Sequence, residues 1–281
     1  MNVMKGHPMK SNIAEYVALR YPPLAIFFAD NPPVNGKEAK GSCAMIPVSQ
    51  AAKGQTVYFK IGSCTCPGAG WGLALETLDA DRFPGGRECY YRFLSVGNEN
   101  CEEGRRWHEQ LRAHGASNMF LEEFREGEGF LKTPELTKEF TDSIPVISEK
   151  GTYIVIKPLD QIAQDETPKV IAFLVDPDQL SAMVVLANYA RPGIDNVRIP
   201  FGAGCMTFGV YAFHEAEQEN PKAVVGLTDI SARLFLRKIL GRDILSFTVP
   251  FALYEEMESN AADSFLSRSA WKKIRGNNDG G

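Results

Sequence analysis

The sequence lacks the features typical of membrane, secreted and nucleic-acid-binding proteins. No window approaches about 18 uninterrupted apolar residues, the length expected of a membrane-spanning helix. The N-terminal stretch MNVMKGHPMKSNIAEYV has no apolar run long enough for a signal-peptide core. The formal net charge of −5 leaves no basic field for a phosphate backbone. We therefore expect a cytoplasmic protein that contacts no membrane and no nucleic acid.

Sequence motifs of common enzymes are also missing. The four histidines form no HExxH or other ligand-spaced pair, and no GxSxG nucleophile elbow occurs. The glycines in FPGG (83–86) and FGAG (201–204) complete neither a GxGxxG fingerprint nor a Walker motif. The sequence therefore assigns no catalytic residue, although a cysteine and a histidine far apart in the chain could still form a nucleophile pair.

The chain has the composition of an ordinary globular protein, and it contains six cysteines. Hydrophobic residues make up 44% and charged residues 23% of 281 residues, so the chain can bury the core of one large unit or of two modest halves. Thiols stay reduced in the cytoplasm. The cysteines are therefore interpreted as metal ligands, reactive groups or core residues rather than as a disulfide framework.

Two stretches of the chain follow the same order of predicted elements. PLAIFFADNPP (23–33) and KVIAFLVDPDQ (169–179) each predict a buried strand that runs into a turn. Short helices that end at glycine are predicted after them, from Cys43 and from Ser181. Strand-like residues with alternating polarity then lead into two turns that contain glycine and cysteine, GSCTCPGAG and GAGCMTFG.

Spacing supports a relationship between these stretches. Met45 lies 21 residues before Cys66, and Met183 lies 22 residues before Cys205. We therefore expect an α+β or α/β fold of two related halves from an internal duplication, with mixed sheets flanked by helices. The two turns should then face each other across a pseudo-twofold axis.

The predicted boundaries follow from this division. Residues 1–140 form an N-terminal half with the cysteine-rich turn, 150–257 form the pseudo-repeat, and 258–281 form a C-terminal helix and polar tail. A linker is predicted between Pro134 and Gly151. Helices are predicted at EEGRRWHEQLRAHG (102–115) and at SARLFLRKILG (231–241), the latter with Ser231 as its N-cap.

These elements together resemble the family known as domain of unknown function 169, found largely in archaea and anaerobic bacteria. The resemblance covers about Tyr21 to Met257. Its residues are Cys43 in its Cys-Ala-Met start, the Cys64–Gly70 turn, Gly204 with Cys205, Arg233, and FTVPFALYEEM at 247–257. The family carries no established activity, so the resemblance implies a relationship and an anaerobic setting but no mechanism.

The evidence for a cofactor or a reaction therefore has to come from the cysteines themselves. An iron–sulfur cube needs four thiolates that converge in a small volume, with backbone N–H groups near the sulfurs. Cys43, Cys64, Cys66 and Cys205 form such a set if the two halves close on each other, and they are the predicted ligands of a [4Fe-4S] cluster. The backbone of Gly62, Gly68 and Gly204 is predicted to approach this cofactor. Cys66 with Pro67 also resembles the Cys-Pro step of many cluster ligands.

Other interpretations of the same residues stay open. Zinc also binds four thiolates, but the two Cys-x-x-Cys knuckles of structural zinc sites are absent. A non-redox protein that binds a small ligand would use the cysteines only for packing, and a thiol enzyme would use Cys64 or Cys66 as nucleophile. The expected partner is a small molecule or a redox protein, and a homodimer is left open.

The region from 87 to 112 has a second group of charged residues and cysteines. Cys89 and Cys101 are reserve ligands there and are more often structural at such positions. Five arginines could clamp an anion, but glutamates alternate with them at helical spacing, which favours a solvated helix face. They are Arg87, Arg92, Arg105, Arg106 and Arg112.

Overall fold

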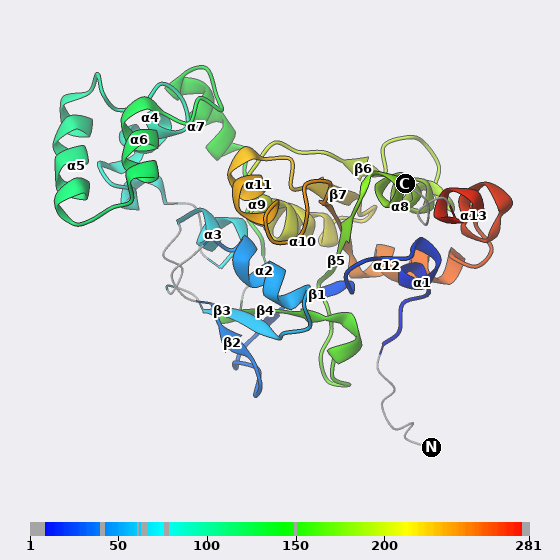
Figure 1. Ribbon diagram of the computed structural model, residues 1–281. Helices are drawn as coiled ribbons and strands as arrows, with labels where there is room; N and C mark the ends of the chain where they lie inside the picture. Colours follow the sequence, from blue (N-terminus) through cyan, green and yellow to red (C-terminus); the bar gives the residue numbers. More distant parts are fainter. Residues whose placement is uncertain are drawn as a thin grey trace. The chain divides into compact units, whose positions relative to one another are not determined.

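A mixed β-sheet organises most of the chain (Figure 1). The computed structural model describes residues 9–39, 43–60, 62, 67–75, 79–148 and 151–276. The sheet belongs to a unit formed by Met1–Glu76 and Val146–Gly281, and Thr77–Pro145 forms a second unit. The predicted class, α+β or α/β with a mixed sheet and flanking helices, is confirmed. The strands are β1 (Leu24–Ala29), β2 (Lys37–Glu38), β3 (Val57–Lys60), β4 (Tyr153–Pro158), β5 (Val170–Val175), β6 (Val197–Arg198), β7 (Ala223–Gly226) and β8 (Leu245–Pro250).

The strand order is the same when it is read outward from the centre in either direction. The sheet runs β2-β3-β4-β1-β5-β8-β7-β6, with β1 and β5 as the central antiparallel pair. The outermost pair on each side is parallel, and the other pairs are antiparallel. Leu24 pairs with Pro158 on one side as Val170 pairs with Pro250 on the other. Two related halves would adopt this arrangement, and the duplication itself stays a prediction.

Helices cover both faces of the sheet in this unit. On one face, α8 and α12 pack against β5 and β8 and are joined by α1 and α13. On the other face, α9 packs against β7, where a Cβ at Gly226 would meet the Thr207 side chain. The helices of this unit are α1 (Asn12–Val17), α2 (Met45–Ala51), α3 (Pro67–Gly72), α8 (Pro177–Asn188), α9 (Gly204–Phe208), α10 (Val210–Ala216), α11 (Ile230–Leu236), α12 (Phe251–Asn260) and α13 (Ser269–Gly276), with short 3₁₀ turns η2 (Leu159–Gln161) and η3 (Phe265–Ser267).

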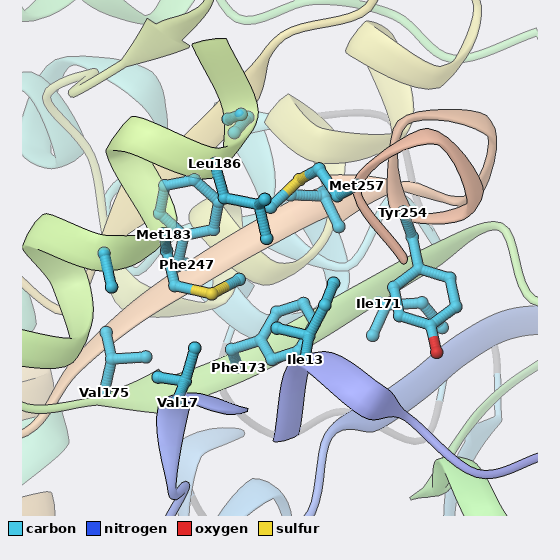
Figure 2. Packing of buried hydrophobic residues seen from close by; sticks show 14 of the residues in the cluster. Ile13, Val17, Ile171, Phe173, Val175, Met183, Leu186, Phe247, Tyr254 and Met257 are labelled. Carbon is cyan, nitrogen blue, oxygen red and sulfur yellow. The ribbon is translucent and has the colours of Figure 1, made fainter. Parts of the chain in front are cut away.

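The hydrophobic core on the first face explains why β5 is apolar at every position. All six β5 residues are buried, as expected for a central strand with helices on both sides. Figure 2 shows Met183 of α8 and Met257 of α12 near Phe173 and Phe247 of the sheet, which are 0% exposed. Truncating a phenylalanine buried in this way typically costs about 3–5 kcal/mol.

The strand pairing aligns the residues of the two halves differently from the predicted alignment. Lys37 of β2 and Arg198 of β6 occupy matching positions when the outer parallel pairs are aligned through β4 and β8. Eight residues after each of them stand Met45 and Met206, so α2 corresponds to α9. The predicted match of Met45 with Met183 was wrong, because α8 joins the first two strands of its half whereas α2 joins the second and third.

An ion pair between a buried lysine and a half-buried glutamate lies on the face of β4 that continues the core. Lys157 Nζ donates to Glu166 Oε1 at 2.7 Å and to Gln161 O at 3.3 Å. The Lys157 side chain is 8% exposed and that of Glu166 is 20% exposed. Phe27 lies beneath the ammonium, with 5.8 Å between Nζ and the ring centroid. Removing one partner of such a pair leaves a charge that water cannot fully solvate.

The second unit is helical within its described residues, 79–145. Its hydrophobic centre is aromatic, with Phe83 stacked on Phe124 at a centroid distance of 5.9 Å and edge-on to Tyr90 at 5.4 Å. The elements are η1 (Ala80–Arg82), α4 (Gly86–Phe93), α5 (Glu102–Ala113), α6 (Asn118–Glu126) and α7 (Pro134–Asp142). The helix predicted at 102–115 is confirmed as α5.

Two local predictions were wrong. The stretch from Pro134, predicted as a linker, begins with helix α7, because the Thr133 hydroxyl caps the Leu136 N–H at 3.3 Å and a proline fits the first helical turn. Helix α11 is capped by Asp229 rather than by Ser231, since the Asp229 carboxylate accepts from the Ala232 N–H at 2.8 Å. The predicted polar tail beyond Gly276 lies outside the described residues.

Candidate functional site

The buried helix α9 places Cys205 against α3. Every residue of α9 is buried, and Cys205 is 7% exposed. The Cys205 Sγ donates to the carbonyl oxygen of Gly68 at 3.1 Å. Gly68 stands two residues after Cys66 in the chain, so the Cys205 thiol lies beside the segment that leaves the cysteine-rich turn.

Glycines allow α3 and α9 to approach this closely. A Cβ at Gly72 would lie 2.5 Å from Cys205 Sγ and 3.0 Å from the Met206 backbone nitrogen. A Cβ at Gly209 would lie 2.7 Å from the Leu73 Cα. The two helices therefore touch backbone to backbone, and any side chain at these positions would separate them.

Replacing Gly72 with alanine is expected to destabilise the protein by roughly 1–3 kcal/mol, because the added methyl overlaps the Cys205 sulfur and a rigid backbone. Urea unfolding followed by circular dichroism measures the change. Gly276→Ala is the matched control, since a Cβ there meets nothing within 4 Å. Equal midpoints for the two variants would contradict the proposed close contact of α3 with α9.

The start of α2, which belongs to the N-terminal half of the sheet, lies against Gly204 at the start of α9. Cys43 is half-buried and stands two residues before Met45, the first residue of α2. A Cβ at Gly204 would lie 3.1 Å from Met45 Sδ and 2.9 Å from the Ala232 Cβ of α11. α2 thus packs against α11, and α3 packs against α9, which is a reciprocal arrangement of corresponding helices from the two halves.

Asp229 adds a half-buried carboxyl group to this region. It caps α11, and burial raises the pKa of Asp229 above its ordinary value although backbone N–H groups, that of Gly204 among them, oppose the shift. This carboxyl is the ionisable group that sequence reasoning missed. An Asp at the start of an apolar helix was the available signal, but it indicates a helix cap rather than a site.

Arg233, one of the residues that carry the family resemblance, has a structural role. Its guanidinium donates to the carbonyl oxygens of Leu227 and Ile244 at 3.3 and 3.2 Å, and also to that of Arg242. These bonds tie α11 to the segments before and after it. A planar fork with five donors suits such a cluster of carbonyls better than a lysine would.

The predicted ligands are brought together in part. Cys43 and Cys205 belong to the segments that meet at Gly204, whereas Cys64 and Cys66 lie outside the described residues. Among the described residues, no group of three or more His, Cys, Asp or Glu side chains is positioned to hold a metal ion. Gly62 is an exposed turn residue with φ +75°, and Gly68 is half-buried.

The reserve candidates lie in the helical unit. Cys89 is 0% exposed in α4 and Cys101 is half-buried before α5. Exposed Arg87 and Arg106 pair with Asp81 and Glu103 respectively, which supports the interpretation of this arginine-rich stretch as a solvated surface.

Comparison with known proteins identifies a family. The chain matches the model of the family described as uncharacterised ArCR, domain of unknown function 169, over residues 12–260. No curated protein and no solved structure matches it. In the described part of the chain, no helix combines the length and the apolar character needed to cross a bilayer. The match includes all the strands of the sheet and the segments around Cys43 and Cys205, and the chain belongs to the domain of unknown function 169 family.

Proposed function

We propose that the protein holds a cysteine-ligated iron–sulfur cluster, of the [4Fe-4S] type, and serves a redox or electron-transfer role. The observation that carries this proposal is the meeting of three cysteine-bearing segments in one unit. The Cys205 thiol contacts Gly68, two residues after Cys66, and Gly204 lies against Met45, two residues after Cys43.

The surroundings of Cys205 fit a cluster chemically. Thiolates are the ligands that such clusters take, and backbone N–H groups near the sulfurs offset their negative charge. Gly72 brings the backbone of α3 close to the Cys205 sulfur, since a Cβ there would lie 2.5 Å from it, and Gly68 supplies the carbonyl oxygen that the thiol contacts. Cys43, Cys64, Cys66 and Cys205 would hold the cluster, and the cluster would supply one-electron chemistry. Cys205 would have to release its proton and its hydrogen bond to Gly68 on binding.

The proposal extends to the setting of the protein. A cytoplasmic location in an anaerobe agrees with reduced cysteines and with an oxygen-sensitive cofactor. Its partner would be a small molecule or a redox protein rather than nucleic acid, because the net charge is −5.

Anaerobic purification of the full chain tests the proposal. We expect a brown protein with broad absorption near about 400 nm and about four iron and four sulfide ions per chain. Iron, sulfide and zinc are measured on the same sample. A colourless protein with one zinc ion would contradict the redox role and favour a structural zinc site. A colourless protein without metal would contradict both the iron–sulfur cluster and the zinc site. The thiol-enzyme and ligand-binding interpretations would then be the ones to test.

A further inference from the structure

Cys89 and Cys101 belong to the helical unit, which contains none of the proposed cluster ligands. Asn98 holds the two segments together. Its side-chain Nδ2 donates to the Cys89 backbone carbonyl at 3.1 Å, and its backbone carbonyl accepts from the Cys101 N–H at 3.2 Å. A Cβ at Gly85 would lie 2.3 Å from Cys89 Sγ and 3.1 Å from Cδ1 of Trp107 in α5, so the Cys89 thiol lies on the side of α4 that faces the helix that Cys101 caps. Thiols on two segments held together in this way can form a disulfide if their Cβ atoms come within about 4.5 Å of each other.

The two thiols differ in their surroundings. Cys89 is 0% exposed, and a side chain at Gly85 would collide with its sulfur. Burial, followed by the nearby Cys101 and Glu103, raises the pKa of Cys89 to about 11. Cys101 is half-buried at the N-cap of the 12-residue helix α5. A reagent in solution therefore reaches Cys101 first, and Cys89 can react only with a group already attached beside it.

We propose that Cys89 and Cys101 are a reversible dithiol–disulfide site that exchanges with small disulfides of the glutathione class. The Cys101 thiolate attacks one sulfur of the reagent, the reagent S–S bond breaks, and one reagent thiolate leaves. Cys89 then gives up its proton and attacks Cys101 Sγ, which releases the second reagent thiolate. The two protein thiols are oxidised to one disulfide, the reagent is reduced to two thiols, and the two protein protons end on them.

Peptide mapping of the full chain tests the site. The reduced protein is incubated with oxidised glutathione, its remaining thiols are alkylated, and it is digested with trypsin without reductant. Cleavage after Arg87, Arg92 and Arg105 separates Cys89 in ECYYR from Cys101 in FLSVGNENCEEGR. The expected product is these two peptides joined, at a mass lower by two hydrogens than the sum of the two, and dithiothreitol should restore both thiols.

Two variants separate the roles of the thiols. Cys89→Ser should keep glutathione on Cys101 because the resolving thiol is gone, and Cys101→Ser should leave Cys89 unmodified. The proposal is overturned if the unaltered protein keeps glutathione on Cys101 while Cys89 is alkylated, if both cysteines are alkylated, or if Cys101 is joined to another cysteine. The unaltered protein supplies this result even if a variant fails to fold. These peptides contain none of the proposed cluster ligands, so failure here leaves the proposed function standing.

Discussion

Cys205→Ser is expected to lower the iron content of anaerobically purified protein by at least about tenfold and to remove most of the absorption near about 400 nm. The serine hydroxyl can still donate to the Gly68 carbonyl, as the Cys205 thiol does at 3.1 Å. The fold should therefore persist while the ligand is lost. Iron analysis, the absorption spectrum and far-ultraviolet circular dichroism of the same sample separate these two effects.

Cys43→Ser is expected to act in the same direction, because Cys43 is half-buried and precedes the helix that lies against Gly204. Cys101→Ser is the matched control: it is also half-buried, it removes one thiol from the other compact unit, and it should retain the iron of the unaltered protein. Retention of full iron by both Cys43→Ser and Cys205→Ser would show that these residues are not ligands.

Glu166→Gln is expected to destabilise the protein by about 3 kcal/mol, the largest effect we anticipate from a single polar substitution. The change removes the negative charge beside Lys157, whose side chain is 8% exposed and rests over Phe27. The ammonium would keep only the Gln161 carbonyl, at 3.3 Å, and a neutral amide. Urea unfolding at neutral pH, analysed by midpoint and slope, measures the loss.

The reverse substitution should be milder. Lys157→Met leaves an apolar side chain against Phe27, while Glu166 keeps the Ala163 N–H at 2.8 Å and partial access to water. We expect a loss of about 1 kcal/mol. Lys138→Met, in the exposed pair with Asp142, is the control and should change the stability by less than about 0.5 kcal/mol. A larger loss for Lys157→Met than for Glu166→Gln would contradict this assignment of the buried charge.

The secondary structure was predictable where the residues of a single segment indicated it. The apolar runs that became β1 and β5 each end at an aspartate, and the alternating charges at 102–113 predicted α5. Thr133 and Pro134 were misjudged because threonine followed by proline occurs both in turns and at helix starts. What separates the two cases is whether the following residues pack, and that depends on distant parts of the chain.

The candidate site was predictable only as a set of residue types. Cysteines among glycines indicated thiolate chemistry. The segments of Cys43 and Cys205 meet only when the two halves of the unit pack against each other. The helix equivalence was misjudged because Met183 and Met45 have similar neighbours in sequence, whereas strand pairing relates Met45 to Met206. Gly72 and Gly209 stayed unnoticed, since a glycine shows its role in helix contact only when the opposing helix is known.

The sequence by itself determined the class of the protein, its family resemblance, and which cysteines are surrounded by small residues, because composition, hydrophobic runs and turn residues are local properties. The tertiary structure decided the strand order, the meeting of α2, α3, α9 and α11 around Gly204, and the Asn98 hydrogen bonds that join the segments of Cys89 and Cys101. It also decided that Lys157 is buried and paired with the half-buried Glu166. The strand order and the helix contacts around Gly204 join residues far apart in the chain, and they form only when the sheet pairs its strands and the helices pack on its faces. The Lys157–Glu166 pair is local in sequence, but its burial depends on Phe27 of β1.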